Sequence, residues 1–131
     1  MRVFKNAWFG RFARKQKIPD AVLRQAVERI ERGQIDADLG GGVVKQRIAG
    51  PGRGKSSGYR TIILFRRSER AVFVYGFAKG ARANIRKDEE EAFKQAAKHV
   101  LALSDGQIEA LIANGQFSEV GSDGQGEEVS E

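Results

Sequence analysis

The chain has 131 residues, enough for one domain with a hydrophobic core, and its 23 Lys and Arg outnumber its 17 Asp and Glu, which gives a net charge of +6. The absence of cysteine excludes a disulfide framework and thiolate metal sites. The sequence has neither an apolar run of the roughly 20 residues that span a bilayer nor an apolar signal-peptide stretch, so we expect a cytoplasmic protein with no membrane contact.

The charge is unevenly distributed along the chain. The first 17 residues hold six Lys or Arg and no acid, whereas residues 118–131 hold five acids and no Lys or Arg, which leaves a net charge of +11 on residues 1–117. The last segment is also rich in Gly and Ser and lacks aromatic residues, a composition typical of disorder. We therefore expect a basic domain at residues 1–117 and an acidic disordered tail at residues 118–131.

The first third of the chain predicts a short strand followed by two helices. Residues 1–8 suit an edge strand, and the aromatic residues that follow recur at helical spacing. After a break at Pro19, apolar residues recur at helical spacing over residues 20–32, and Gly33 stands where a glycine often ends a helix. We expect these helices to form a hairpin with one apolar side.

Three strands are predicted in the middle of the chain. A turn-rich link at residues 36–42 leads into a strand at residues 43–49, and two stronger strand signals follow at residues 59–67 and 70–77. The last two strands are expected to form a tight hairpin through residues 68–69.

Strand alternation assigns side chains to faces of this sheet. Lys45 and Arg47 share one face of their strand, and Val44 and Ile48 lie on the other. Alternation in the last strand puts three aromatic side chains on one face, namely Phe73, Tyr75 and Phe77. They form either a core beneath a helix or a platform on which nucleobases stack.

The rest of the chain predicts helices again. An apolar stripe recurs at helical spacing from residue 84, and Ser104 with Gln107 fits a capping box at the start of a short helix that ends at Gly115. The order β-α-α-β-β-β-α-α predicts an α+β domain with a small antiparallel sheet, an N-terminal helical hairpin on one face and C-terminal helices.

Positive charge is concentrated in the predicted sheet. From Lys45 to Arg70 the chain has eight Lys or Arg and a single acid, Glu69. A small sheet with that much unpaired positive charge typically binds a polyanion, of which nucleic acid is the commonest.

Residues 49–56 (AGPGRGKS) come close to a phosphate-binding loop. A true loop of that kind runs directly into a helix whose N-terminal amides hold the phosphates, whereas here a strand is predicted from Tyr59. We therefore reject a nucleoside triphosphatase. Two interpretations stay open, a plain flexible connection or a basic loop that grips phosphate through Arg53 and Lys55.

Other residues that commonly carry chemistry are sparse. The single histidine, His99, has no second metal ligand at a suitable spacing, and we interpret it as an ordinary helix residue. The acids at residues 89–91 fall early in a predicted helix, where they suit its dipole and the solvent. We expect no metal and no cofactor.

Four segments together resemble the RelE/HigB-like toxins of bacterial type II toxin–antitoxin systems: FGRFAR at 9–14, ADLGGG at 37–42, GKSSGYRT at 54–61 and YGFAK at 75–79. The resemblance covers residues 1–117. It implies a microbial RNase fold, in which a twisted antiparallel sheet has a helical pair on one side and a basic concave face on the other. It also implies cleavage of messenger RNA in the ribosomal A site and neutralisation by a small antitoxin, for which we expect a helix-turn-helix protein.

The chemistry that the resemblance implies needs charge more than a covalent nucleophile. The RNA 2′-OH attacks the adjacent phosphate, so the enzyme must stabilise charge and move protons. Arg60 matches the arginine of the family's Gly-Tyr-Arg, which implies phosphate and transition-state stabilisation. Lys55 is the candidate base if surrounding positive charge lowers its pKa, and Lys79 is a further catalytic candidate. The RNA-binding candidates are Lys45, Arg47, Arg53, Tyr59, Tyr75, Arg82 and Arg86.

The chain departs from the best-known RelE pattern at two positions. Gly80 stands where that pattern has an arginine, and Arg86 where it has a tyrosine, so the resemblance leaves the general acid and base unassigned. We interpret the chain as a ribosome-dependent endonuclease toxin that acts on messenger RNA. Two alternatives stay open, a gyrase-poisoning toxin of the ParE type and a non-catalytic module that binds RNA or an antitoxin.

Overall fold

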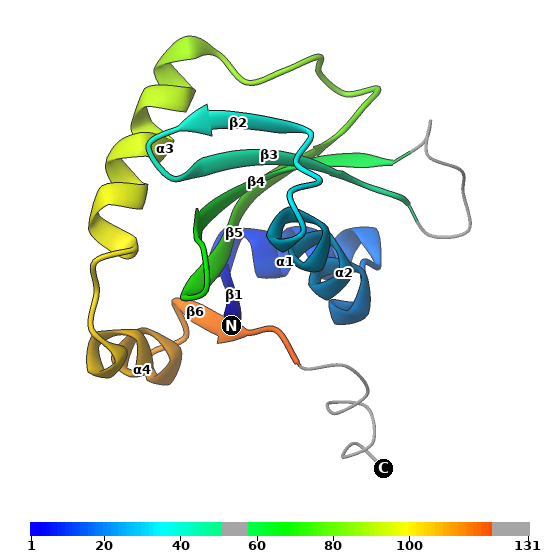
Figure 1. Cartoon of the computed structure of the whole chain (residues 1–131). Coiled ribbons are helices and arrows are strands. Elements are labelled where there is room, and N and C mark those ends of the chain that lie inside the picture. Colours follow the sequence, from blue (N-terminus) through cyan, green and yellow to red (C-terminus); the bar gives the residue numbers. More distant parts are fainter. Residues whose placement is uncertain (51–57, 122–131) are drawn as a thin grey trace.

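The computed structural model describes residues 1–50 and 58–121, and Figure 1 shows them as one sheet with helices on both faces. In chain order the elements are β1 (Arg2–Asn6), α1 (Ala7–Gln16), α2 (Asp20–Glu31), β2 (Ala37–Gly40), β3 (Val43–Ile48), β4 (Tyr59–Arg66), β5 (Arg70–Ala78), α3 (Lys87–Val100), α4 (Asp105–Ala113) and β6 (Phe117–Glu119). Every helix in the described part of the chain is too short or too polar to cross a membrane.

The strands form a sheet in the order β2-β3-β4-β5-β1-β6. Neighbours run antiparallel except β1 and β5, which pair in parallel with Arg2 opposite Arg70. The predicted α+β fold with an antiparallel sheet is therefore confirmed, and the one parallel pair, β1 with β5, is an addition to it. β1 reaches β5 from a distant part of the chain, so no hairpin sets the direction of this pair.

The helices cover opposite faces of the sheet. The predicted hairpin of α1 and α2 packs on one face, where Phe9 and Leu23 meet Ile63 and Phe73. On the other face lie α3 and α4, which contribute Ala97, Leu101 and Ile108 to a second core with Val43, Leu64 and Val72. Two covered faces explain why the strands are apolar on both sides.

The helix boundaries follow local sequence signals. α1 begins after Asn6, whose side-chain oxygen accepts a hydrogen bond from the Phe9 N–H at 2.7 Å. Gly33 follows α2 with a φ of 85°, a left-handed conformation that glycine adopts readily. Ser104 and Gln107 form the predicted capping box at the start of α4.

Two boundary predictions were wrong. The link at residues 36–42 contains β2, which pairs with β3. Ser118 and Glu119, which the predicted tail includes, belong to β6 and lie next to β1, and the following residue, Val120, donates its N–H to the Val3 carbonyl at 2.8 Å. Both segments have weak strand signals but lie against an open strand edge. The rest of the predicted tail, residues 122–131, is outside the described residues.

A β-bulge in β5 decides which aromatic side chains share a face. The pairing register with β4 shifts there, so that Val74 is an extra residue. As a result Phe73 packs in the core beneath α1 and α2, whereas Tyr75 packs on the α3 side. Gly76 then faces α1, and Phe77 returns to the face of Tyr75. The prediction that all three aromatics share one face is therefore wrong.

Candidate functional site

Two rows of side chains lie on the α3 side of the sheet, where β3 and β5 end and β4 begins. The outer row consists of Arg47, Arg60 and Phe77, which stand opposite one another on β3, β4 and β5. The inner row consists of Lys45, Ile62 and Tyr75. We call these two rows, together with Lys79 and Arg82 from the segment after β5, the cationic face.

The backbone before β4 leaves no room for a side chain. A Cβ on Gly58 would collide with the carbonyl oxygen of Ile48. The Gly58 carbonyl in turn accepts a hydrogen bond from the Lys79 N–H at 3.2 Å. Gly58 therefore allows the ends of β3, β4 and β5 to come together, and it sets the position of Arg60 two residues later.

Arg60 is the central cation of this surface. Its Nε is buried and has no hydrogen-bond partner among the described residues. Arg47 stands directly opposite on β3, and like charges at opposite positions of neighbouring strands destabilise a sheet. Because buried donors are nearly always paired, the arrangement suits an anion that binds both arginines.

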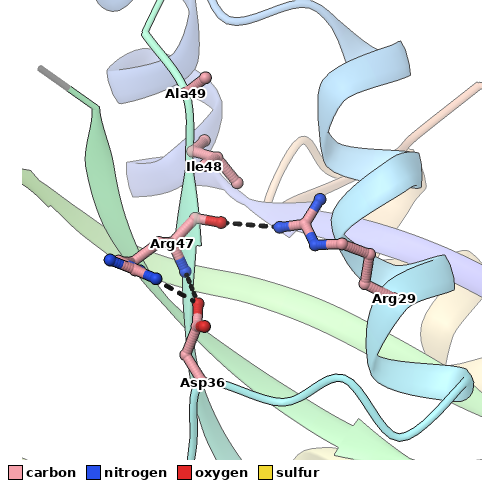
Figure 2. Close-up of a pocket in the computed structure, with 5 residues that line it drawn as sticks. All are labelled: Arg29, Asp36, Arg47, Ile48 and Ala49. Atoms are coloured by element: carbon pink, nitrogen blue, oxygen red, sulfur yellow. Dashed lines mark hydrogen bonds and ion pairs between the residues drawn. The ribbon is translucent and has the colours of Figure 1, made fainter. Parts of the chain in front are cut away.

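Arg47 is held in place through its backbone, as Figure 2 shows. Its N–H donates to the Asp36 carboxylate at 2.6 Å, and its carbonyl accepts from the Arg29 guanidinium at 2.8 Å. These contacts lie beside a hollow of about 280 Å³ that Ile48 and Ala49 also line. The Arg47 side chain is 62% exposed, with its Nε 3.7 Å from the Asp36 carboxylate, so much of its guanidinium is open to a ligand.

Arg82 lies over the aromatic part of the cationic face. Its guanidinium carbon is 5.9 Å from the centre of the Tyr75 ring and 5.5 Å from that of Phe77, within cation–π range. Nη1 donates to the Tyr75 hydroxyl at 3.0 Å, and Nη2 donates to the Glu89 carboxylate at 2.6 Å. These hydrogen bonds raise the pKa of Arg82, and the bond from Arg82 is the main reason that the pKa of Glu89 falls to about 2.

Other basic residues on and near this surface are also engaged. Arg86 pairs with Asp88 at 3.0 Å and lies 3.8 Å from Glu89 at the start of α3. The hydrogen bond from its side chain to Asp88 raises the pKa of Arg86. The Lys45 ammonium donates to the Asn84 side chain at 3.1 Å. Two acids thus neutralise much of the positive charge that follows β5.

The two tyrosines lie on opposite faces of the sheet. Tyr59 packs against the core of α1 and α2, and its hydroxyl donates to the Gln16 side-chain oxygen at 2.9 Å. Tyr75 lies on the cationic face, with its ring centre 4.7 Å from that of Trp8 and 5.9 Å from that of Phe93. Tyr59 therefore cannot meet a ligand that binds Arg60 from the α3 side.

The predicted site residues are divided by the fold. The cationic face brings together Lys45, Arg47, Arg60, Tyr75, Lys79 and Arg82. Tyr59 lies on the opposite face, and Arg86 is turned toward the acids at the start of α3. Arg53 and Lys55 lie outside the described residues.

Two residues that shape this surface were not among the candidate site residues, although Phe77 belongs to the aromatic stripe for which a stacking role stayed open. Phe77 stands beside Arg60 beneath the Arg82 guanidinium. Glu89 holds Arg82, although its place in the first turn of a helix is equally typical of a solvated acid. No feature of the sequence distinguishes Glu89 from its neighbours Glu90 and Glu91 in this respect.

The remaining candidates take no part in the cationic face. His99 is an exposed residue of α3. Within residues 1–50 and 58–121, no group of three or more His, Cys, Asp or Glu is placed to hold a metal ion. The segment after the glycine-rich residues continues as the strand β4 rather than as a helix, which agrees with the rejection of a phosphate-binding loop.

A family comparison adds independent information. The model of the family described as RelE toxin of RelE / RelB toxin-antitoxin system matches residues 1–120 of the chain. This span includes every described helix and strand, from β1 to β6. A search of curated proteins finds none that matches.

Proposed function

Since this chain belongs to the RelE toxin family and is the toxin partner of an antitoxin, we propose that it is an endoribonuclease that cuts messenger RNA on the ribosome. The observation that carries the proposal is the buried Arg60 Nε, which has no partner in the described part of the chain and faces Arg47 across the sheet. A phosphate of the RNA backbone supplies the acceptor that the Arg60 Nε lacks, and it adds negative charge beside Arg47, whose only nearby carboxylate in the described residues is Asp36 at 3.7 Å.

The proposed reaction uses the RNA itself as the nucleophile. The 2′-oxygen of one nucleotide attacks the adjacent phosphate, and the bond from phosphorus to the next 5′-oxygen breaks. Negative charge accumulates on the phosphate oxygens between Arg60 and Arg47, which the sheet holds in fixed positions. Charges that need no rearrangement during the reaction contribute strongly to transition-state stabilisation.

The other basic residues have supporting roles in this proposal. Lys79 is exposed at the end of β5 and contacts a neighbouring phosphate. Lys45, on the inner row, binds the RNA beyond the scissile phosphate. Lys55 is the proposed base that accepts the 2′-OH proton, and Arg53 lies in the same basic segment.

The antitoxin is proposed to be a small helix-turn-helix protein that covers the cationic face. Burial of the cationic face favours a partner that presents acidic side chains there. Because such an interface rests on many contacts, Arg60→Ala is expected to keep antitoxin binding, which a pull-down with the antitoxin checks.

The test of the proposed activity is cleavage of a labelled messenger RNA bound to purified ribosomes. Wild-type toxin is expected to cut the bound message and to leave the same RNA intact without ribosomes. Arg60→Ala is expected to abolish cutting. Arg66→Ala is the matched control, because Arg66 lies at the far end of β4 and pairs with Glu69 at 3.5 Å.

Three outcomes contradict the proposal in different ways. An intact message together with inhibited gyrase supercoiling indicates a toxin of the ParE type. Binding of RNA or antitoxin without any cleavage indicates a non-catalytic module. Equal cleavage with and without ribosomes removes the ribosome from the proposed function but leaves the endoribonuclease.

A further inference from the structure

The hydroxyl groups of the two tyrosines differ in what they bind. The Tyr59 hydroxyl donates a hydrogen bond to the Gln16 side-chain oxygen at 2.9 Å. The Tyr75 hydroxyl instead accepts a hydrogen bond from Arg82 Nη1 at 3.0 Å, and its own proton has no acceptor within residues 1–50 and 58–121. The Tyr75 hydroxyl is therefore available to donate a hydrogen bond to a ligand on the cationic face.

The Tyr75 side chain is fixed from several sides. Its ring centre lies 4.7 Å from that of Trp8, 5.9 Å from that of Phe93 and 6.0 Å from that of Phe77. Arg82, which holds the hydroxyl, is itself held by two hydrogen bonds to Glu89, at 2.6 and 3.2 Å. Proton transfer in a transition state needs such fixed geometry.

Tyr75 is also close to Arg60. Arg60 stands opposite Phe77, and Tyr75 precedes Phe77 by two residues on the same face. Tyr75 and Arg60 are therefore diagonal neighbours across the two strands, a relation that places α-carbons about 7–8 Å apart. A phosphate held by Arg60 therefore lies on the same face of the sheet as the Tyr75 side chain.

We propose that Tyr75 is the general acid of the RNA cleavage, with Arg82 and Glu89 as its positioning residues, an inference that rests on the proposed function. As the 2′-oxygen bonds to phosphorus, its proton passes to a base and the bond to the 5′-oxygen breaks. The electron pair of that bond takes the Tyr75 proton, which yields a 2′,3′-cyclic phosphate and a 5′-hydroxyl. Arg82 stabilises the phenolate until water returns a proton.

The guanidinium groups nearby are poorer proton donors. Arginine stays protonated at all ordinary pH values, and the hydrogen bond to Glu89 raises the pKa of Arg82 further. Arg60 has the same chemistry and is already assigned to the phosphate charge. A phenol in a model peptide, with a pKa of about 10, loses its proton far more readily than a guanidinium.

The test compares two versions of one scissile linkage, with oxygen or sulfur as the bridging 5′ atom, in a synthetic messenger RNA bound to ribosomes. A thiolate leaves without being protonated, so a general acid affects only the oxygen linkage. Tyr75→Phe keeps the ring and removes the hydroxyl. We expect it to cut the oxygen linkage about 100-fold more slowly or worse, and the sulfur linkage within about threefold of wild type.

Glu89→Gln tests the positioning role, and Glu119→Gln is its matched control. Loss of the Glu89 charge loosens Arg82, so we expect about tenfold slower cutting of the oxygen linkage and little change with sulfur. Glu119 forms a comparable ion pair with Arg2 at 2.9 Å, on a different part of the sheet. Its variant is expected to cut both linkages at the wild-type rate.

The outcomes separate this inference from the proposed function. Equal slowing of both linkages by Tyr75→Phe, or slowing of neither, overturns the general-acid role. Wild-type toxin that cuts neither linkage overturns the proposed function instead. Thermal melting of each variant shows whether it is folded, and if Tyr75→Phe is not, the linkage dependence of Glu89→Gln decides.

Discussion

Arg60 and Arg82 lie on the same surface, but their surroundings are opposite. Arg60 extends from the middle strand of the sheet, with a buried Nε that has no partner in the described part of the chain and with another arginine, Arg47, across from it. Arg82 extends from the segment after β5, and Glu89 neutralises its charge while two aromatic rings support it. Arg60 can therefore bind an added anion, whereas the charge of Arg82 is already neutralised by Glu89.

This difference teaches that a count of basic residues does not measure free positive charge. Backbone pairing places Arg60 opposite Arg47, and of the two only Arg47 has a carboxylate within 4 Å in the described part of the chain, so a bound anion would reduce their repulsion. The segment after β5 lies close to the acidic start of α3, so Arg82 and Arg86 form ion pairs with carboxylates of that helix. The first region suits the binding of an anionic ligand, and the second suits holding the side chains of the site in position.

The largest expected difference between the two regions is in activity. Arg60→Ala should slow RNA cleavage by roughly 100- to 1,000-fold, because one fixed charge at a transition state contributes about 3–4 kcal/mol. Arg86→Ala, which removes an arginine that is already paired, should slow cleavage only about twofold. Single-turnover rates on ribosome-bound message measure both. Similar losses for the two variants would contradict the distinction between free and paired cations.

The stability of the protein should also depend on Gly58, where the ends of β3, β4 and β5 come together. Gly58→Ala forces a Cβ against the Ile48 carbonyl, and such overpacking typically costs about 1–3 kcal/mol of unfolding free energy. Gly10→Ala is the control, because a Cβ at Gly10 meets no atom within 4 Å and alanine favours a helix by about 1 kcal/mol. Urea unfolding measures both changes. A Gly58→Ala variant as stable as wild type would show that the strand ends can separate without cost.

The stability contributed by the Arg82–Glu89 ion pair should decrease at acidic pH. The folded-state pKa of Glu89 is about 2, below its ordinary 4.5, so its contribution to stability is complete above about pH 4.5 and is lost as the pH falls toward 2. Glu89→Gln should therefore flatten the dependence of unfolding free energy on pH within this window. An unchanged slope in the variant would mean that the Arg82–Glu89 pair does not stabilise the folded state.

The smallest expected effect concerns salt. An arginine that contacts an RNA phosphate contributes about 0.7 to the slope of log affinity against log salt concentration. Arg60→Ala should reduce the slope by about that amount, and Arg86→Ala by much less. Ribosome or RNA binding at several salt concentrations measures the slopes. An equal reduction for the two variants would place Arg86 against a phosphate after all.

Much of the architecture followed from local sequence signals. Helical spacing predicted α1 and α2, the capping box at Ser104 predicted the start of α4, and alternation put Lys45 and Arg47 on one face of β3. These features depend on residues a few positions apart, and the backbone geometry of helices and strands links such positions directly.

The features that escaped prediction depend on distant parts of the chain. β2 and β6 form because a neighbouring strand offers unpaired backbone groups, not because their own residues favour strands. The bulge at Val74 moves Tyr75 away from the face of Phe73, and strict alternation cannot reveal an added residue. The parallel pairing of β1 with β5 is likewise set by packing between remote segments.

The sequence by itself determined that this protein is a basic α+β domain with Arg60 opening its central strand, because composition, periodicity and motif are properties of neighbouring residues. Only the tertiary structure decided which basic side chains keep free charge. Whether an arginine is paired depends on which carboxylate the fold brings within about 4 Å of it, since the strength of an ion pair falls with distance and with solvent screening. Arg82 forms an ion pair with Glu89, whereas Arg60 stands opposite another arginine, Arg47. Arg60 can therefore bind an anionic ligand, and this makes the cationic face a candidate site.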